Sequence, residues 1–442
     1  MNRTILDDLD RWKVSAHRKP LLLKGLRQVG KTWALKAFGA TRYEDVAYFN
    51  FEERPELAEL FASTKEPARI IGNLSMLHGR PIRPEATLLI FDEIQECNAA
   101  LNALKYFSED ANQYHLACAG SLLGVTLSRP ASFPVGKVDF LTLHPMSFIE
   151  FLEGNGDRAL LDYLLAIDRI GDIPEIFFNP LEEKLKWFFV TGGMPEAIDA
   201  WVSDRDAGRV QAVLSDLLDA CLLDFSKHAK PAVVPRIAAL WKSLPSQLAR
   251  ENKKFVYGVV KPGARAREYE DALAWLETAG LVHRVFRCAK PGMPMSAYRD
   301  LSAFKLYAAD VGLLRRLANL SPDAFGDAGR LFTEFKGALS ENYVLQSLAR
   351  MEGDPPYYWS SGGQAEVDFL IQRGDAILPV EVKSDRNLRS RSLSVYGAAY
   401  AAETPLKIRF SLKNLRRDGD ILNIPLFMVD LLDRILALDR GR

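Results

Sequence analysis

The stretch LLLKGLRQVGKTWAL, residues 21–35, decides the fold of the first part of the chain. Four residues separate Gly25 from Gly30, and Lys31 and Thr32 follow at once, which is the spacing G-x-x-x-x-G-K-[ST]. The leucines before this loop and the helix-forming residues after it are typical of a buried strand, a loop and a helix. In that setting backbone N–H groups wrap a polyphosphate, Lys31 reaches its β and γ groups, and the Thr32 hydroxyl ligates Mg²⁺.

The loop is therefore predicted to bind ATP with Mg²⁺. The glycines allow the backbone to approach the phosphates, and the following helix points its positive N-terminal end at the anion. A plain glycine turn with a solvated lysine is the alternative, and the flanking segments argue against it. The predicted cofactor-binding residues are Gly25, Leu26, Arg27, Gln28, Val29, Gly30, Lys31, Thr32 and Trp33.

A second element of the same site is TLLIFDEIQ, residues 87–95. Its continuous apolar run is typical of a central parallel strand, which ends in two carboxylates at the edge of the sheet where ligands gather. We expect Asp92 to hold Mg²⁺ together with Thr32, and Glu93 to act as the general base for water that attacks the γ-phosphate. A strand that simply stops at a solvated acidic turn is the alternative.

A third strand is expected at HLACAGS, residues 115–121, and it ends in Ser121. The serine hydroxyl either touches the γ-phosphate or the attacking water, or it caps the next helix; both interpretations stay open. The predicted catalytic residues are Glu93, Lys31 and Ser121.

Composition limits the class of protein. The chain has 442 residues, enough for about three domains, and 57 basic against 57 acidic residues, so net charge favours no partner. No uninterrupted apolar stretch reaches the roughly 18 residues of a membrane span. We therefore expect no membrane attachment. A reducing cytoplasm is also expected, because the cysteines are far apart in the sequence and form no C-x-x-C pair: Cys97, Cys118, Cys221 and Cys288.

These pieces resemble the AAA+ branch of the P-loop ATPases. Within that branch, several phrases are similar to those of one prokaryotic family of predicted ATPases, over nearly the whole chain: GLRQVGKT around Lys31, FDEIQ after Ile90, GKVDFLTLHPMSFIEFL from Gly136 and TGGMPEAI from Thr191. The resemblance implies a helical lid after the nucleotide core, homo-oligomers such as a hexamer, and a C-terminal domain of uncertain function.

The same resemblance implies an arginine that acts on the site of a neighbouring subunit. The family tends to carry arginine where this chain has Lys137, and lysine lacks the planar fork of arginine. Arg129, in the loop after Ser121, is the substitute. Lys137 and Arg129 are thus the two candidates for this role.

The middle of the chain is predicted to be helical. Apolar spacings of three and four residues over 146–204 predict the lid, and TGGMP at 191–195 predicts a turn or a nucleotide-sensing hinge. The stretch EYEDALAWLETAGLVHRVF, 268–286, resembles the last helix and wing of a winged-helix module. The cations before this stretch predict either a basic face that binds DNA or a helical spacer with a solvated charged face. These cations are Lys253, Lys254, Lys261, Arg265 and Arg267.

Near the end, EVDFLIQRGDAILPVEVK, residues 366–383, predicts a β-hairpin. Asp368, Glu381 and Lys383 are expected on one side of it, where the acids would hold Mg²⁺ and the lysine would orient water. This resembles the PD-(D/E)XK nucleases, resolvase-like members above all, and Glu341 on the helix ahead would be a further acid. Val367 replaces the usual proline, and a buried ion-paired lysine would give the same sequence, so cleavage stays open.

The tract from 385 to 417 carries eight cations and two acids, which predicts a track for phosphates, with solvated surface as the alternative. The acids are Asp385 and Glu403, and the cations are Arg386, Arg389, Arg391, Lys407, Arg409, Lys413, Arg416 and Arg417.

The sequence thus predicts an α/β protein with four parts. These are an AAA+ parallel-sheet core (1–145), a helical lid (146–204), a winged-helix connector (205–300) and a PD-(D/E)XK nuclease-like domain of the restriction-endonuclease class (301–442). The predicted function is Mg-dependent ATP hydrolysis coupled to binding DNA in repair or recombination. The preference for branched DNA, such as a Holliday junction, comes from the resemblance alone. The alternatives are an ATP-gated metal-dependent nuclease and a nucleotide-controlled protein-interaction switch.

Overall fold

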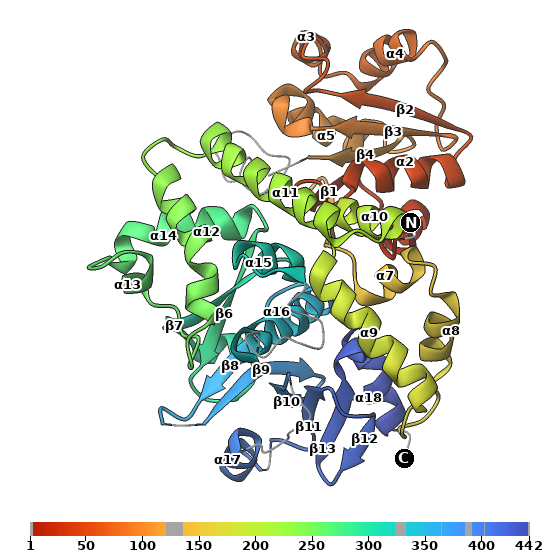
Figure 1. Cartoon of the computed structure of the whole chain (residues 1–442). Coiled ribbons are helices and arrows are strands. Elements are labelled where there is room, and N and C mark those ends of the chain that lie inside the picture. Colours follow the sequence, from red (N-terminus) through yellow and green to blue (C-terminus); the bar gives the residue numbers. More distant parts are fainter. Residues whose placement is uncertain are drawn as a thin grey trace. The chain divides into compact units, whose positions relative to one another are not determined.

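The computed structural model describes residues 3–120, 136–322, 333–363, 365–384, 391–401 and 403–440. The chain forms two compact units (Figure 1). The N-terminal unit holds Asn2–His144 with Thr278–Gly280, and the C-terminal unit holds Pro145–Glu277 and Leu281–Arg442. Within the described ranges, no helix has the length and the apolar character needed to cross a bilayer.

The N-terminal unit is built on a five-stranded sheet of order β2-β3-β4-β1-β5, in which all neighbours are parallel. This confirms the predicted parallel-sheet domain. The central strands β3 and β4 are buried at every position, as their unbroken apolar sequences require. The strands are β1 (Leu21–Gly25), β2 (Asp45–Asn50), β3 (Thr87–Asp92), β4 (His115–Ala119) and β5 (Asp139–Leu143).

Aromatic packing fixes the strand that carries the acidic pair. The ring of Phe91 makes edge contacts with Phe51, Phe61 and Phe107, with centroids 5.4, 5.5 and 6.5 Å apart. Since Phe91 directly precedes Asp92, this core holds the end of β3 in place. The helices of the unit are α1 (Ile5–Val14), α2 (Lys31–Arg42), α3 (Leu57–Ser63), α4 (Pro67–His78), η1 (Ile94–Glu96) and α5 (Asn98–Asp110).

The C-terminal unit begins with helices that the sequence assigns to a lid, and these helices pack against the end of the chain. The N–H of Phe148 donates to Asp430 Oδ2 at 2.9 Å, and Phe178 contacts the ring of Phe427 at 5.1 Å. The helices up to residue 278 are α7 (Phe148–Gly154), α8 (Arg158–Ala166), α9 (Glu175–Thr191), α10 (Pro195–Asp204), α11 (Ala207–His228), α12 (Val234–Leu248), α13 (Tyr257–Val260) and α14 (Ala266–Thr278).

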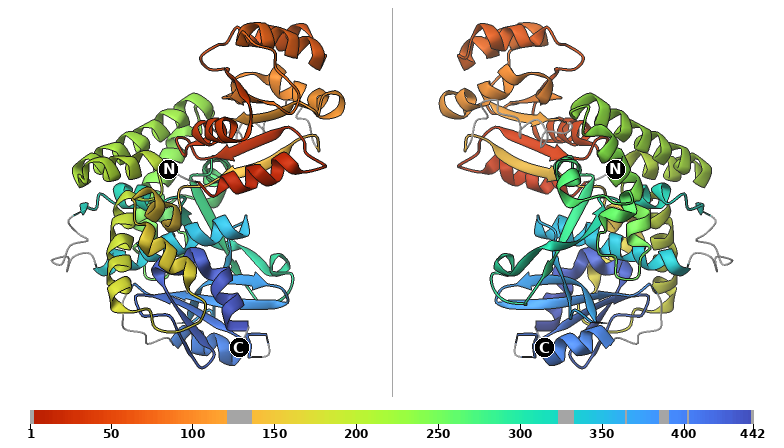
Figure 2. Two further views of the ribbon diagram at one scale, coloured as in Figure 1. Left: turned by 90° about the vertical axis from the view of Figure 1, so that its right-hand side faces the viewer. Right: turned by 90° about the vertical axis from the view of Figure 1, so that its left-hand side faces the viewer.

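An eight-stranded sheet of order β12-β13-β11-β10-β9-β8-β6-β7 forms the rest of this unit. The predicted hairpin is present, because β9 and β10 pair antiparallel around Gly374, whose φ is +66°. In Figure 2 the green strands β6 and β7 continue the sheet of the cyan and blue strands. The strands are β6 (Val282–Cys288), β7 (Arg299–Ala308), β8 (Tyr357–Ser360), β9 (Glu366–Arg373), β10 (Ala376–Val382), β11 (Lys407–Ser411), β12 (Arg416–Asp418) and β13 (Ile421–Pro425).

Three helices and an antiparallel hairpin, α12 to β7, follow one another in the segment compared with a winged helix. β6 also lies beside β8, so strands from both sides of residue 300 share one sheet. The remaining helices are η2 (Met295–Tyr298), α15 (Val311–Leu317), α16 (Thr333–Glu352), α17 (Arg391–Ala399), η5 (Leu426–Leu431) and α18 (Leu432–Arg440).

The TGGMP turn is a tight junction with the start of α15. The N–H of Gly193 donates to Asp310 Oδ2 at 2.6 Å, and the N–H of Leu313 donates to the other oxygen of that carboxylate at 2.9 Å. Gly192 has φ +65° and ψ −162°, a conformation that essentially only glycine adopts, and a Cβ there would lie 2.2 Å from Asp310 Oδ1. The two glycines are therefore needed for close packing.

Candidate functional site

The loop between β1 and α2 has the backbone that a phosphate site needs. Gly25 has φ +151°, and a Cβ at this position would lie 2.3 Å from the carbonyl oxygen of Leu143 on β5. Gly30 caps α2 with φ +96°, and Gln28 also has a positive φ, of +59°. Only glycine fits at Gly25, so the loop can pass close to β5 and present its N–H groups at the helix N-terminus.

Lys31 lies at the centre of this loop. Its buried ammonium donates to the carbonyl oxygens of Gly25 at 3.0 Å and Leu26 at 2.9 Å. Phosphate oxygens are charged acceptors and bind an ammonium more strongly than neutral carbonyls do. The arrangement therefore holds the lysine where a polyphosphate could replace the carbonyls.

The two predicted metal ligands are brought into contact. The Thr32 hydroxyl donates to Asp92 Oδ2 at 2.7 Å, and the Tyr48 hydroxyl donates to the same oxygen at 2.8 Å. The N–H of Glu93 donates to Asp92 Oδ1 at 3.1 Å. A hydroxyl and a carboxylate beside a phosphate loop are the hard oxygen ligands that Mg²⁺ takes, so these residues fit the ion.

Glu93 has an unusual backbone conformation. Its φ of +49° and ψ of +42° lie in the left-handed region, which a non-glycine residue adopts rarely and often at functional sites. Gln95 Nε2 donates to Glu93 Oε2 at 2.5 Å. The chain therefore turns sharply at Glu93, and Gln95 holds its carboxylate, which suits a group that positions water.

The remaining predicted residues of this site are placed as follows. Leu26 and Val29 are buried, so they would serve a nucleotide through their backbone, while Trp33 on α2 is 46% exposed. Lys137 forms an ion pair with Glu109 at 2.8 Å. Arg27 is half-buried and Gln28 is exposed. Ser121 and Arg129 lie outside the described residues.

Sequence reasoning missed three residues around the site. Tyr48 and Asn50 lie on β2, where Asn50 is in register with Asp92 on β3, and Asn50 Oδ1 accepts from the N–H of Glu52 at 2.9 Å. Arg3 is buried and donates to the carbonyl oxygens of Val29 at 3.0 Å and His144 at 2.7 Å. The short strand DVAYFN beside a predicted acidic strand could have indicated β2, whereas nothing local marks Arg3.

The C-terminal unit brings Glu341 and Asp368 together, but with cations between them. We call Glu341, Glu366, Asp368, Lys253 and Lys305 the carboxylate cluster. Lys253 forms an ion pair with Glu341, and Lys305 Nζ lies 2.5 Å from Glu366 Oε1. Asp368 Oδ2 accepts the N–H of Val382 at 2.8 Å.

Glu381 and Lys383, the other two predicted members, pair with one another and with Arg409. Lys383 Nζ lies 3.3 Å from Glu381 Oε1, and Arg409 Nε donates to Glu381 Oε2 at 3.2 Å. Arg409 and Glu381 are both buried. Within the described part of the chain, no group of three or more His, Cys, Asp or Glu is arranged to hold a metal ion.

Burial and charge shift the acids of the cluster in opposite directions. Burial, with the neighbouring charge of Glu341, raises the pKa of Asp368 to about 7 against the pull of Lys305 and Lys253. Burial would raise the pKa of Glu341 too, but Lys253 and Lys305 outweigh it and the pKa is lowered. Burial alone would lower the pKa of Lys305, which the attraction of Glu366, Glu341 and Asp368 raises instead.

The predicted basic faces are changed by these ion pairs. Lys253 points into the carboxylate cluster, while Lys254, Lys261, Arg265 and Arg267 are exposed. In the C-terminal tract, four of the cations bind carboxylates, since acids just outside the tract supply partners: Arg409 with Glu381, Lys407 with Asp420, Arg416 with Asp418, and Arg417 with Asp439. Arg386 and Arg389 lie outside the described residues. These four side chains thus pair with carboxylates of the chain, and the phosphate track stays a prediction.

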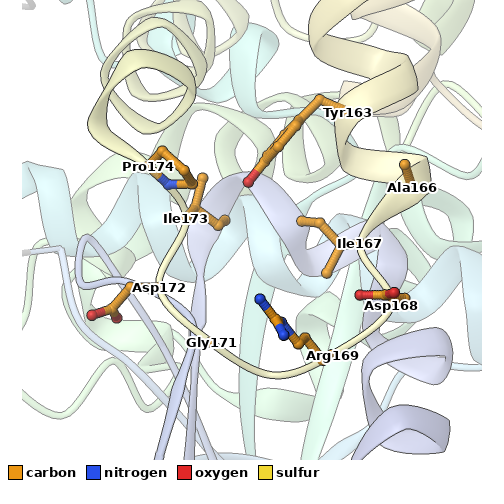
Figure 3. A pocket seen from close by; sticks show the side chains of 9 residues that line it. All are labelled: Tyr163, Ala166, Ile167, Asp168, Arg169, Gly171, Asp172, Ile173 and Pro174. Carbon is orange, nitrogen blue, oxygen red and sulfur yellow. The ribbon is translucent and has the colours of Figure 1, made fainter.

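A pocket of about 340 Å³ lies at the loop between α8 and α9 (Figure 3). The loop is held by Asn414, which exchanges two 2.8 Å hydrogen bonds with the backbone of Ile173. The ring of Tyr163 lines the pocket and stacks on Phe177 at 3.9 Å. Its charged residues, Asp168, Arg169 and Asp172, are all exposed, so no buried charged group singles out a ligand.

Residues 17–152 match the AAA domain family. This segment is an ATPase domain of the AAA type. ATP with Mg²⁺ is its cofactor, in agreement with the geometry around Lys31, Thr32 and Asp92. Residues 182–324 and 336–427 match two families described as domains of unknown function, DUF8612 and DUF4143. No curated protein matches the chain.

Three solved structures are similar to parts of the chain. The Walker-type ATPase paby2304 of Pyrococcus abyssi is 16% identical, with a TM-score of 0.45 over 71% of this chain and 94% of that one. AMPPCP-bound DnaA from Aquifex aeolicus is 11% identical, with a TM-score of 0.28 over 62% and 86%. The Aeropyrum pernix Orc1 protein in complex with DNA is 13% identical, with a TM-score of 0.26 over 71% and 90%. Scores this low say nothing about what this chain binds.

Proposed function

We propose that the N-terminal unit hydrolyses ATP with the following division of labour. Lys31 binds the β- and γ-phosphate oxygens, Thr32 and Asp92 hold Mg²⁺, and Glu93 accepts a proton from the attacking water. Mg²⁺, when bound, neutralises charge on the phosphates. The observation that supports the proposal is the 2.7 Å hydrogen bond from the Thr32 hydroxyl to Asp92, because it brings the two proposed ligands into contact beside the loop.

The surroundings support these roles. The Tyr48 hydroxyl holds the Asp92 carboxylate from the side of β2, and the Glu93 N–H binds its other oxygen. Gln95 holds the Glu93 carboxylate, so the base is oriented before substrate arrives. Such preorganisation limits the reorganisation that the side chains need during the reaction.

The test compares ATP hydrolysis by wild type, Glu93→Gln and Glu96→Gln. Glu96 is exposed in the same 3₁₀ turn and makes the matched control. We expect Glu93→Gln to bind ATP and to lose a factor of about 10² or more in hydrolysis, the usual contribution of a general base, while Glu96→Gln keeps the wild-type rate. Equal rates in the two variants would remove Glu93 from the mechanism.

We propose further that hydrolysis is coupled to binding DNA. The supporting observation is the exposure of four cations between the end of α12 and the first turn of α14: Lys254, Lys261, Arg265 and Arg267. The acids that follow on α14 are partly neutralised, since Arg284 pairs with Glu270 at 3.2 Å and also with Glu277. Phosphate contact would therefore be made at the N-terminal end of this helix. Branched DNA, and a role in repair or recombination, rest on the family resemblance.

The measurement is ATP hydrolysis without DNA and with duplex, single-stranded and four-way-junction DNA. The variant Lys261→Glu/Arg265→Glu is compared with Lys65→Glu/Lys186→Glu, which makes the same charge change at two exposed lysines elsewhere. We expect stimulation by DNA, greatest for the junction, that is lost in the first variant and kept in the second. Hydrolysis indifferent to every DNA would favour the protein-interaction switch instead.

Homo-oligomerisation is part of the proposal. In the described chain Lys137 is engaged by Glu109, so this lysine is poorly placed to reach a neighbouring subunit. Sedimentation with and without ATP tests assembly. If Arg129→Ala loses ATP hydrolysis but still binds ATP, the trans-acting role would be assigned to Arg129.

A further inference from the structure

Two lysines pair with acids of the cluster that the sequence compared with a PD-(D/E)XK metal site. We propose that the ammonium groups of Lys253 and Lys305 act as built-in counter-ions of Glu341, Glu366 and Asp368 and thereby replace a divalent cation in the C-terminal unit. The carboxylate cluster is then a nearly charge-balanced core that binds no catalytic metal. This inference concerns the C-terminal unit and does not depend on the ATPase mechanism.

Lys305 is the first part of the argument. It comes from β7, is 0% exposed, and lies 2.5 Å from Glu366, with Glu341 and Asp368 close enough to attract it. Its Nζ also lies 5.0 Å from the centre of the Tyr358 ring. A buried ammonium is stable only when carboxylates compensate it, so these acids are committed to the lysine. A divalent cation placed among the same oxygens would be repelled by the ammonium.

Lys253 is the second part, and it is independent of Lys305. It lies in the loop between α12 and α13, with a φ of +46°. A lysine in this left-handed conformation persists when its surroundings hold it, and here its ammonium pairs with buried Glu341. Tyr307 donates its hydroxyl to the other oxygen of Glu341 at 3.2 Å. Both oxygens of Glu341 are therefore occupied by groups of the chain itself.

The charges of the cluster nearly cancel. Among the described residues, three carboxylates meet two ammonium groups, which leaves one negative charge. On the neighbouring strand Glu381 is taken by Arg409 and Lys383. Of the acids that the nuclease pattern would give to a metal, Glu341 is thus paired with Lys253, and Glu381 with Arg409.

The experiment measures Mn²⁺ binding to the full-length chain in the absence of nucleotide. The concentration of free Mn²⁺ is read from its electron paramagnetic resonance signal, which decreases when the protein binds the ion. All proteins carry Asp92→Asn, so the nucleotide site contributes no carboxylate ligand. The parent is compared with Asp368→Asn, with Lys305→Met and with Lys253→Met, whose uncharged side chains have about the length of lysine. Circular dichroism confirms that each variant is folded.

We expect the parent and Asp368→Asn to bind the same amount of Mn²⁺, because the cluster holds none in either protein. We expect Lys305→Met to bind one further Mn²⁺, and we expect this additional binding to disappear when Asp368→Asn is added to Lys305→Met. Mn²⁺ bound by the parent and lost in Asp368→Asn would overturn the proposal. A folded Lys305→Met that gains no site would also overturn it, because the lysine would not be what excludes the metal. If Lys305→Met does not fold, the same two outcomes are read from Lys253→Met, since Lys253 neutralises Glu341.

Discussion

Replacing Gly192 with alanine tests how tightly the TGGMP turn is built into the C-terminal unit. The backbone of Gly192, at φ +65° and ψ −162°, is nearly closed to other residues, which costs about 1–3 kcal/mol. The new Cβ would lie 2.2 Å from Asp310 Oδ1, 2.7 Å from the Gly312 nitrogen and 2.8 Å from its Cα. Relieving such overpacking costs a further 1–3 kcal/mol or so. The free energy of unfolding should therefore fall by about 2–6 kcal/mol.

Gly263→Ala is the control for backbone strain. Gly263 has φ +77°, and no described atom outside its chain neighbours lies within 4 Å of a Cβ built there, so only the strain of roughly 1–2 kcal/mol applies. Urea unfolding can be followed by fluorescence, because five of the seven tryptophans lie in the C-terminal unit: Trp187, Trp201, Trp241, Trp275 and Trp359. If the two variants unfold at the same urea concentration, the turn is not tightly packed against α15 and the reasoning fails.

Two further predictions concern single hydrogen bonds and charges. Tyr48→Phe removes the hydroxyl that donates a hydrogen bond to Asp92, a bond worth about 1 kcal/mol. Half-maximal ATP hydrolysis should therefore need about fivefold more Mg²⁺, while the rate at saturating Mg²⁺ changes little. An unchanged Mg²⁺ dependence would contradict a positioning role for Tyr48. Asp368 has a folded-state pKa near 7, above its ordinary 3.8, so its contribution to stability is fully present below about pH 4 and is lost as the pH rises through 7. Wild type should therefore lose stability relative to Asp368→Asn between pH 4 and 8 in thermal unfolding. A constant difference would show that burial and the charge of Glu341 do not raise the pKa of Asp368.

The candidate nucleotide site could be predicted because its residues lie at short, fixed spacings in the sequence. The loop needs Gly25 close to β5 and a lysine at the start of the helix, and the strand needs its acids at the carboxyl end. The eight residues 25–32 and the nine residues 87–95 were therefore enough to predict these two elements. The β9–β10 hairpin was predictable for the same reason, since alternation and a glycine turn are local signals. The contributions of Tyr48 and Arg3 were missed, because each depends on a contact made across the sheet or from outside it.

The carboxylate cluster could not be predicted, because its decisive partners are distant in the sequence. Lys253 is 88 residues from Glu341, and no spacing rule connects Lys305 with Glu366. The same applies to the basic tract. Its cations were counted between residues 385 and 417, whereas their partners Asp418 and Asp420 follow just after this range and Asp439 lies 22 residues beyond Arg417. A run of like charges in sequence does not become a charged surface when the fold supplies counter-ions.

The contacts of α7 to α10 attach these helices to the rest of the C-terminal unit. Gly193 is bound to Asp310 at 2.6 Å and Phe148 to Asp430 at 2.9 Å, while Arg350 on α16 also binds Asp430 at 2.7 Å. The start of α7 and the turn before α10 are therefore attached to the same framework as α15 and α16. Helix α16 carries Glu341, a member of the carboxylate cluster. A displacement of α7 to α10 within the C-terminal unit would consequently either carry the C-terminal sheet with it or break these buried bonds, and the first costs less because it leaves the buried groups paired.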